Sequence, residues 1–204
     1  MAYALAPENL LTPKAKSESF YKEKGSKFLG FLYPVSSQVV IKECLASLRQ
    51  LYPDATHICY AWRLGEFGEI IFANDDGEPA HSAGAPILRA IRSAKLNAVL
   101  IAVVRYYGGT KLGIPGLINA YQAAANIAIE QTITEPFVSK TTVEIQCTYS
   151  LESKIRSLIS RYQGVVINST HTTSVLLTAQ INTQDVADFL NASPCPVTIH
   201  GRLF

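Results

Sequence analysis

The sequence of 204 residues contains little that would direct the chain into a membrane or out of the cell. Its N-terminus has no basic region followed by a sustained apolar stretch, which argues against a secretory signal. Its longest apolar run, around residues 98–104, is far too short to span a bilayer. The four cysteines form no C-x-x-C pair and have no clustered histidines beside them. We therefore expect a cytoplasmic protein with no metal and no cofactor.

Charged residues are also scarce, and neither sign predominates. Only 17% of the residues are charged, and the formal net charge is +2, with 13 basic and 12 acidic residues before Pro136 and 5 basic and 4 acidic after it. This balance neither demands nor excludes a phosphate-rich partner, so any nucleic acid would have to bind a local patch. The hydrophobic fraction of 48% is enough to build a globular core.

The familiar motifs of nucleotide and acyl chemistry are missing. The segment 108–113 contains glycines, a hydroxyl and a lysine, but Leu112 follows Lys111 where a phosphate-binding P-loop requires serine or threonine. The glycine intervals also differ from those of the dinucleotide-binding turn, and no serine lies in a G-x-S-x-G elbow. Nucleotide hydrolysis, NAD binding and serine hydrolysis are therefore poorly supported.

Two glycine-rich segments, 74–84 and 105–113, are the most informative features that are present. Each lies between a strand-like run and a helix-like run, an arrangement that points backbone N–H groups outward at the positive end of a helix dipole. Adjacent tyrosines in a strand face opposite ways, so one ring at most of the pair 106–107 would stack a base. The predicted anion-binding or nucleic-acid-binding residues are Arg105, Tyr106, Gly108, Gly109, Thr110, Lys111, Gly113, Ser82 and Gly84.

Asp75, Asp76, Glu78 and His81 form an acidic motif inside the first segment. Such a cluster could hold a divalent cation or supply a general acid and base, but its spacing matches no metal loop. A turn shaped by Asp and Gly, with Glu78 favouring the start of the next helix, explains most of the same residues. Both interpretations stay open at this point, and His81 and Glu78 are the candidates for catalysis.

Hydrophobic periodicity predicts an α+β protein. In the first part the pattern indicates helices after Ser36, Ser82 and Gly113 and strands at 26–35, 57–64, 69–73 and 97–106, the last of them central. After Pro136 it resets to strand, helix, two strands, helix and strand. This βαββαβ order is typical of a ferredoxin-like unit.

The sequence resembles the YigZ/IMPACT family. The matching motifs are Asp75-Asp-Gly-Glu-Pro79, Ala83-Gly84-x-Pro86-Ile-Leu88, Val103-Val-Arg-Tyr-Tyr-Gly-Gly-Thr-Lys-Leu-Gly113 and Gly116-Leu-x-x-Ala120-Tyr121, with Lys24-Gly-Ser-Lys-Phe28 and His57-x-Cys59-x-Ala61-x-Arg63 before them. The resemblance implies a ribosomal-protein-S5-domain-2-like α/β sandwich in residues 1–135. It also implies a ferredoxin-like domain similar to domain V of elongation factor G in residues 136–204.

The resemblance further implies binding to RNA or to a ribosome-associated protein. Our leading hypothesis is a non-enzymatic binding protein in which both glycine-rich segments line one anion-binding cleft. The alternative is an enzyme acting on a small phosphorylated or acidic metabolite, with His81 or Glu78 moving a proton and Lys111 holding the anion. A third, structural interpretation treats both segments as turns that fix helices on the sheet.

Overall fold

The computed structural model describes residues 9–203, and the side chains of residues 9–200. It divides into two compact units, one ending at Phe137 and the other beginning at Val138. The expectation that the chain begins without a secretory signal concerns residues 1–8, which lie outside this range. In the described part of the chain, no helix is both long enough and apolar enough to cross a bilayer.

A five-stranded antiparallel sheet forms the centre of the first unit, in the order β2-β3-β6-β4-β5. The strands are β2 (Ser17–Glu23), β3 (Ser26–Pro34), β4 (His57–Leu64), β5 (Ile70–Asn74) and β6 (Val99–Tyr106). The predicted central strand is thus confirmed as β6, between β3 and β4.

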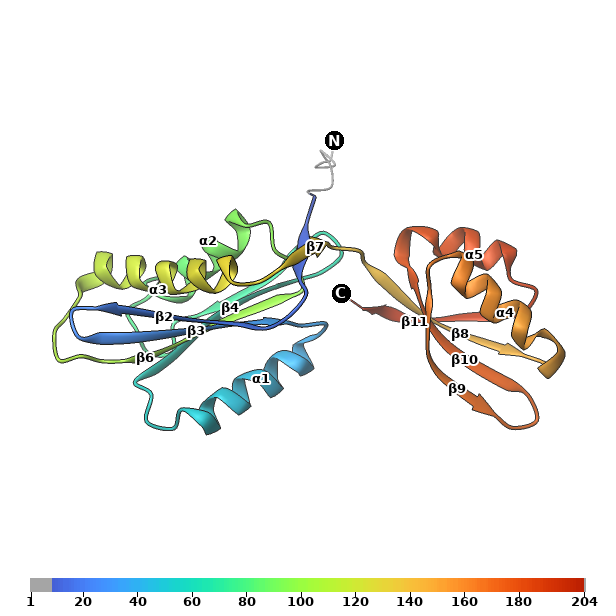
Figure 1. Cartoon of the computed structure of the whole chain (residues 1–204), viewed down its shortest axis with the longest axis horizontal. Coiled ribbons are helices and arrows are strands. Elements are labelled where there is room, and N and C mark those ends of the chain that lie inside the picture. Colours follow the sequence, from blue (N-terminus) through green and yellow to red (C-terminus); the bar gives the residue numbers. More distant parts are fainter. Residues whose placement is uncertain (1–8, 204) are drawn as a thin grey trace. The chain divides into compact units, whose positions relative to one another are not determined.

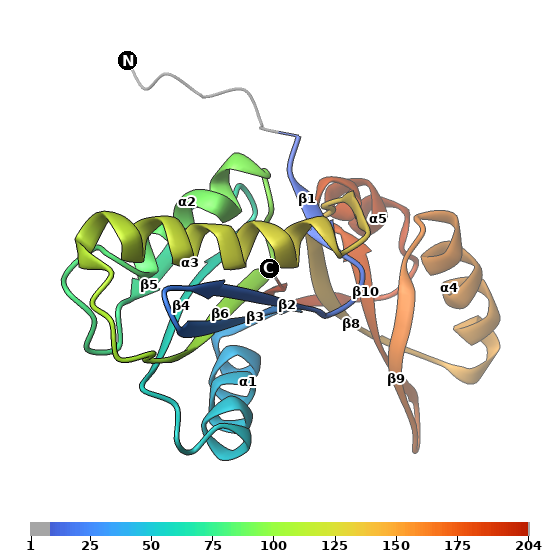
Figure 2. The ribbon, with the colours of Figure 1, turned by 60° about the vertical axis from the view of Figure 1, so that its left-hand side comes forward.

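Helices cover both faces of this sheet (Figures 1 and 2). Helices α2 (Gly84–Ser93) and α3 (Gly113–Glu130) pack on one face, and α1 (Gln38–Leu51) packs on the other. Along β6, Ile101 and Val103 belong to the core under α2 and α3, whereas Ala102 and Val104 belong to the core under α1. The continuous apolar run of β6 follows from burial on both faces.

Three short or polar strands were not predicted from the sequence. Strands β1 (Leu11–Pro13) and β7 (Thr134–Pro136) pair with each other, and β2 forms an edge of the main sheet. Strand β2 reads SESFYKE, which lacks the β-branched run of a typical strand. It is fastened by its serines, because the hydroxyls of Ser17 and Ser19 donate to α3 carbonyls at 2.6 Å each.

The second unit is a four-stranded antiparallel sheet in the order β11-β8-β10-β9 with two helices. Its elements are β8 (Lys140–Cys147), α4 (Tyr149–Arg161), β9 (Val165–His171), β10 (Val175–Asn182), the short 3-10 helix η1 (Thr183–Asp185), α5 (Val186–Ala192) and β11 (Val197–Leu203). Buried residues such as Ile145, Ile155 and Phe189 form a core of its own. The α+β class and the ferredoxin-like βαββαβ order are confirmed.

Candidate functional site

Asp75, in the first glycine-rich segment, caps the start of α2. One carboxylate oxygen, Oδ1, accepts the N–H groups of Ala83 at 3.0 Å and Gly84 at 2.8 Å, and the other accepts the N–H of His81 at 2.8 Å. Ser82 donates both its N–H and its hydroxyl to the carbonyl of Pro79. These bonds correct the expectation that Ser82 and Gly84 offer free N–H groups to an anion.

The other members of the acidic motif point to separate partners. Asp76 accepts the N–H of Ile58 at 2.7 Å and pairs with Arg49 at 3.1 Å. His81 has a φ of +62°, is exposed, and is not among the residues that line the pocket described below. No set of three or more His, Cys, Asp and Glu side chains in the described residues is arranged to hold a metal ion. The motif is therefore used mainly for turn and cap formation.

Glu78 and Arg105 form a buried ion pair that joins the two glycine-rich segments. The Arg105 Nη1 donates to Glu78 Oε1, and the two side chains are only 6% and 4% exposed, respectively. Tyr121, from α3, donates its hydroxyl to the same carboxylate oxygen at 2.7 Å. A buried carboxylate needs such partners, because each unpaired charge in the interior costs several kcal/mol.

Arg105 is held from several sides. Its Nη2 donates to Ser26 Oγ at 3.3 Å, and its guanidinium lies 5.4 Å from the ring centroid of Phe28 and 5.6 Å from that of Tyr107. Its Nε is buried and has no acceptor among the described residues. Arg105 is thus a fixed and largely neutralised charge in the floor of the site, rather than the exposed phosphate ligand that the sequence suggested.

A second layer of hydrogen bonds lies beneath this pair. Cys59 Sγ donates to the carbonyl of Asp75 at 3.0 Å and lies 3.3 Å from the Tyr121 hydroxyl. Burial raises the pKa of the Cys59 thiol and of the Tyr121 phenol far above their ordinary values. Both groups therefore stay neutral at physiological pH, and Tyr121 remains a hydrogen-bond donor to Glu78.

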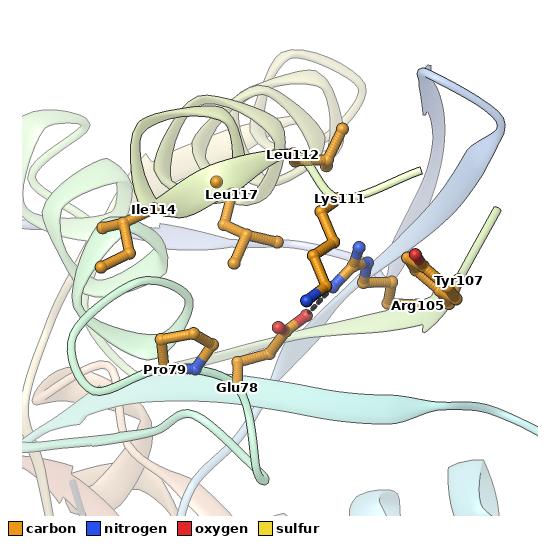
Figure 3. Close-up of a pocket in the computed structure, with 9 residues that line it drawn as sticks. Glu78, Pro79, Arg105, Tyr107, Lys111, Leu112, Ile114 and Leu117 are labelled. Atoms are coloured by element: carbon orange, nitrogen blue, oxygen red, sulfur yellow. Dashed lines mark hydrogen bonds and ion pairs between the residues drawn. The ribbon is translucent and has the colours of Figure 1, made fainter. Parts of the chain in front are cut away.

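The ion pair forms the floor of a pocket of about 340 Å³ (Figure 3). This volume lies at the small end of the range for ligand sites, about 300–1,000 Å³. Figure 3 shows the Lys111 side chain extending toward Glu78 and Arg105, with apolar side chains from the start of α3 beside it. The lining residues are Glu78, Pro79, Arg105, Tyr107, Lys111, Leu112, Gly113, Ile114 and Leu117.

The second glycine-rich segment leaves its polar groups open. Within the described residues, Lys111 has no ion-pair partner, and the N–H groups of Gly109, Thr110 and Lys111 have no acceptor. Helix α3 has no side-chain cap and no acidic residue in its first turn. Since Glu78 cancels Arg105, the pocket carries one net positive charge from Lys111. This arrangement is suited to an anion.

Tyr107, rather than Tyr106, lies at the pocket. Tyr106 packs against the core under α1, whereas Tyr107 lines the pocket and is 47% exposed. The assignment of Tyr106 to the site is therefore corrected, and the reason is strand alternation. Because Arg105 faces the side of α2 and α3, the residue two positions later shares that side, and this signal was available in the sequence.

Gly108 has a structural role in the same loop. Its N–H donates to Ser26 Oγ at 3.1 Å, and a Cβ added to it would lie 1.9 Å from the backbone of Gly25. Of the remaining predicted residues, Gly113 lines the pocket, Gly109 has a φ of +84°, and Thr110 is exposed beside Lys111. Tyr121, Cys59 and Ser26 were not predicted as site residues, although all three lie in the motifs that carry the family resemblance.

The fold and the site define a two-unit α+β protein of a known domain arrangement. The sequence profile described as "Impact N-terminal domain" matches residues 24–129, and the "Domain of unknown function (DUF1949)" profile matches residues 145–192. The chain belongs to the IMPACT family.

Individual relatives extend this likeness over most of the chain. The chain is 34% identical to "IMPACT family member YigZ" of Escherichia coli over 184 residues, which cover 89% of this chain and 90% of the relative. It is 31% identical to "Protein IMPACT" of Rattus norvegicus over 134 residues, which cover 63% of this chain and 42% of that relative. A solved structure titled "Crystal structure of an hypothetical protein" matches with a TM-score of 0.70 and 32% identity, covering 93% and 95% of the two chains.

Proposed function

We propose that this protein is a non-enzymatic cytoplasmic RNA-binding protein with a role in translation, and that it holds one RNA phosphate group at the pocket. The observation that carries the proposal is that Lys111 has no ion-pair partner in the described residues, while the other two charged residues of the pocket, Arg105 and Glu78, pair with each other. The free N–H groups of residues 109–111 and the uncapped start of α3 add donors around the same point.

A nucleotide suits the rest of the pocket. The Tyr107 ring is exposed at the pocket and offers a stacking surface for a base, and the small volume matches one nucleotide unit rather than a long duplex groove. The resemblance to the IMPACT family is what suggests translation. Acid and base chemistry has less support for two reasons. The Glu78 carboxylate already pairs with Arg105 and accepts the Tyr121 hydroxyl. His81 is not among the residues that line the pocket.

The test is a salt titration of RNA affinity for the wild type and Lys111→Ala. We use a labelled oligouridylate of about ten nucleotides, within the site size of single-strand binders. Loss of one phosphate contact should lower the slope of log K against log salt by about 0.7. If the plots of log K against log salt for the wild type and Lys111→Ala converge near 1 M salt, the RNA affinity of the variant at about 0.15 M salt should be about fourfold lower.

The matched control is Lys42→Ala, which removes an exposed lysine of α1 on the opposite face of the sheet. Its affinity and salt slope should equal those of the wild type. An unchanged slope in Lys111→Ala, or an equal loss in Lys42→Ala, would show that RNA does not bind at the pocket.

A further inference from the structure

We propose that the β2–β3 hairpin is a second RNA-contact surface, which extends from the pocket to Lys24 at the hairpin turn and around it to Lys22 and Lys27 on the α1 side of the sheet. This inference rests on the proposed RNA-binding function. All three lysines are exposed, and none has a carboxylate partner in the part of the chain that the structure describes. The hairpin therefore presents uncompensated positive charge.

The turn of the hairpin places a lysine where the backbone does not favour one. Lys24 and Gly25 are the two central residues between the paired Glu23 and Ser26, with φ values of +45° and +83°. Positive φ at both positions is the geometry of a type I′ turn, which prefers Asn or Asp followed by Gly. A lysine at the first position is strained by about 1–2 kcal/mol, and strain of this kind motivates a search for function.

Two further lysines face each other across the hairpin. Lys22 and Lys27 are direct partners in the β2–β3 register, and like charges directly opposite destabilise a strand pair. The Lys22 Nζ lies 5.2 Å from the ring centroid of Phe20, whose side chain is 53% exposed. An exposed aromatic ring beside paired cations is the combination that single-stranded nucleic-acid sites use.

In the described structure, the acidic residues of the hairpin form no ion pair with these lysines. Glu23 accepts a hydrogen bond from the Tyr21 hydroxyl at 3.1 Å, and Glu18 lies farther along β2, opposite Phe31. A bound polyanion would relieve the repulsion between Lys22 and Lys27.

The hairpin is continuous with the pocket. Its turn lies beside the loop that precedes α3 in both ribbon views (Figures 1 and 2). The contact is close, because a Cβ on Gly25 would lie 2.9 Å from the carbonyl oxygen of Gly108. Ser26 Oγ binds both Gly108 and Arg105.

Lys24 lies at the turn of the hairpin. Lys22 and Lys27, by contrast, face the α1 side of the sheet, because Lys27 pairs with Tyr106, which packs under α1. An RNA strand that leaves the phosphate at Lys111 toward the hairpin therefore meets Lys24 first. It then passes around the end of the hairpin to reach Lys22 and Lys27.

The experiment compares two probes on the full chain, uridine monophosphate and an oligouridylate of about ten nucleotides. For Lys22→Gln with Lys27→Gln, oligouridylate affinity should fall about tenfold at about 0.15 M salt, and the salt slope should fall by about 1.4, twice the value for one contact. Affinity for the monophosphate should not change. Lys42→Gln with Lys154→Gln removes the same charge from exposed sites elsewhere and should leave both probes unaffected.

Lys24→Asn separates binding from folding. The substitution introduces the preferred Asn-Gly pair, so Tm should rise while oligouridylate affinity falls about fourfold. A lower affinity with a lower Tm would indicate a damaged fold instead and would contradict the inference.

The outcomes distinguish this inference from the proposed function. If the hairpin variants bind oligouridylate like the wild type while Lys111→Ala binds more weakly, the hairpin surface is wrong and the pocket stands. If the wild type binds no RNA, both fail. If poly-glutamate binds the hairpin lysines more tightly than the oligouridylate does, the partner is an acidic protein segment, and the RNA surface is overturned.

Discussion

Glu78 and Arg105 carry opposite charges in a place where water reaches neither side chain well. Their pairing determines the charge of the pocket, because it leaves Lys111 as the one uncompensated cation among the lining residues. The same pairing fixes the ends of two sequence segments to each other, with the Tyr121 hydroxyl as a third partner. A ligand that bound as proposed would therefore meet a floor whose charges are already paired.

Removing one partner of this pair should be costly. Glu78→Gln leaves the Arg105 charge buried without a counter-ion, so we expect the free energy of unfolding to fall by about 3–5 kcal/mol. Urea denaturation followed by circular dichroism measures this change. Glu130→Gln, an exposed change at the end of α3, should stay within about 0.5 kcal/mol of the wild type. A loss below about 1 kcal/mol in Glu78→Gln would mean that solvent reaches the pair in solution.

Single residues were the part of the site that the sequence predicted least well. Arg105 and Lys111 look equivalent in the sequence, since both are basic residues beside a glycine pair. Their difference depends on Glu78, which lies 27 positions from Arg105 and meets it only through sheet pairing. Local motifs do not contain that information, whereas the choice between Tyr106 and Tyr107 was within reach of strand alternation.

At the scale of elements, the two strand-to-helix junctions are both glycine-rich, but they differ in whether the first N–H groups of the helix have a side-chain acceptor. Helix α2 begins with N–H groups that Asp75 already satisfies, and α3 begins without a side-chain cap. An internal carboxylate and an external anion satisfy such a helix start by the same physics. The contrast is why we place the ligand at α3 and not at α2.

Asp75 should accordingly behave as a helix cap. Asp75→Ala removes the acceptor for two N–H groups of α2 and should lower the free energy of unfolding by about 1–2 kcal/mol. Asp75→Asn keeps one amide oxygen and should lose less. Thermal and urea unfolding measure both variants, with Asp54→Ala, an exposed change in the turn after α1, as the neutral control. Equal stability of Asp75→Ala and the wild type would remove the distinction between the two junctions.

Most elements were predictable because their hydrophobic periods are strong. The limits given for β4 from sequence coincide with the observed His57–Leu64, and the uninterrupted apolar run of β6 indicated its central place. Strand β2 was not predictable in this way, because most of its residues are polar. It is held in place by hydrogen bonds from two of its serines to α3, which the local sequence does not reveal. The hairpin surface was missed together with β2.

At the scale of the whole molecule, the chain consists of two units with separate hydrophobic cores. The reset of periodicity after Pro136 was visible in the sequence, but the pairing order of the strands was not, because pairing is decided by contacts distant along the chain. The pocket and the hairpin both belong to the first unit. We therefore expect RNA contacts to be confined to that unit.

The most direct test is a nuclear magnetic resonance titration of the ¹⁵N-labelled full chain with the oligouridylate. The largest amide shifts should occur at Gly109, Thr110 and Lys111, followed by the hairpin turn at Lys24 and Gly25, with the second unit unchanged. The absence of shifts at residues 109–111, or larger shifts in residues 138–203 than at the pocket, would contradict RNA binding at this site.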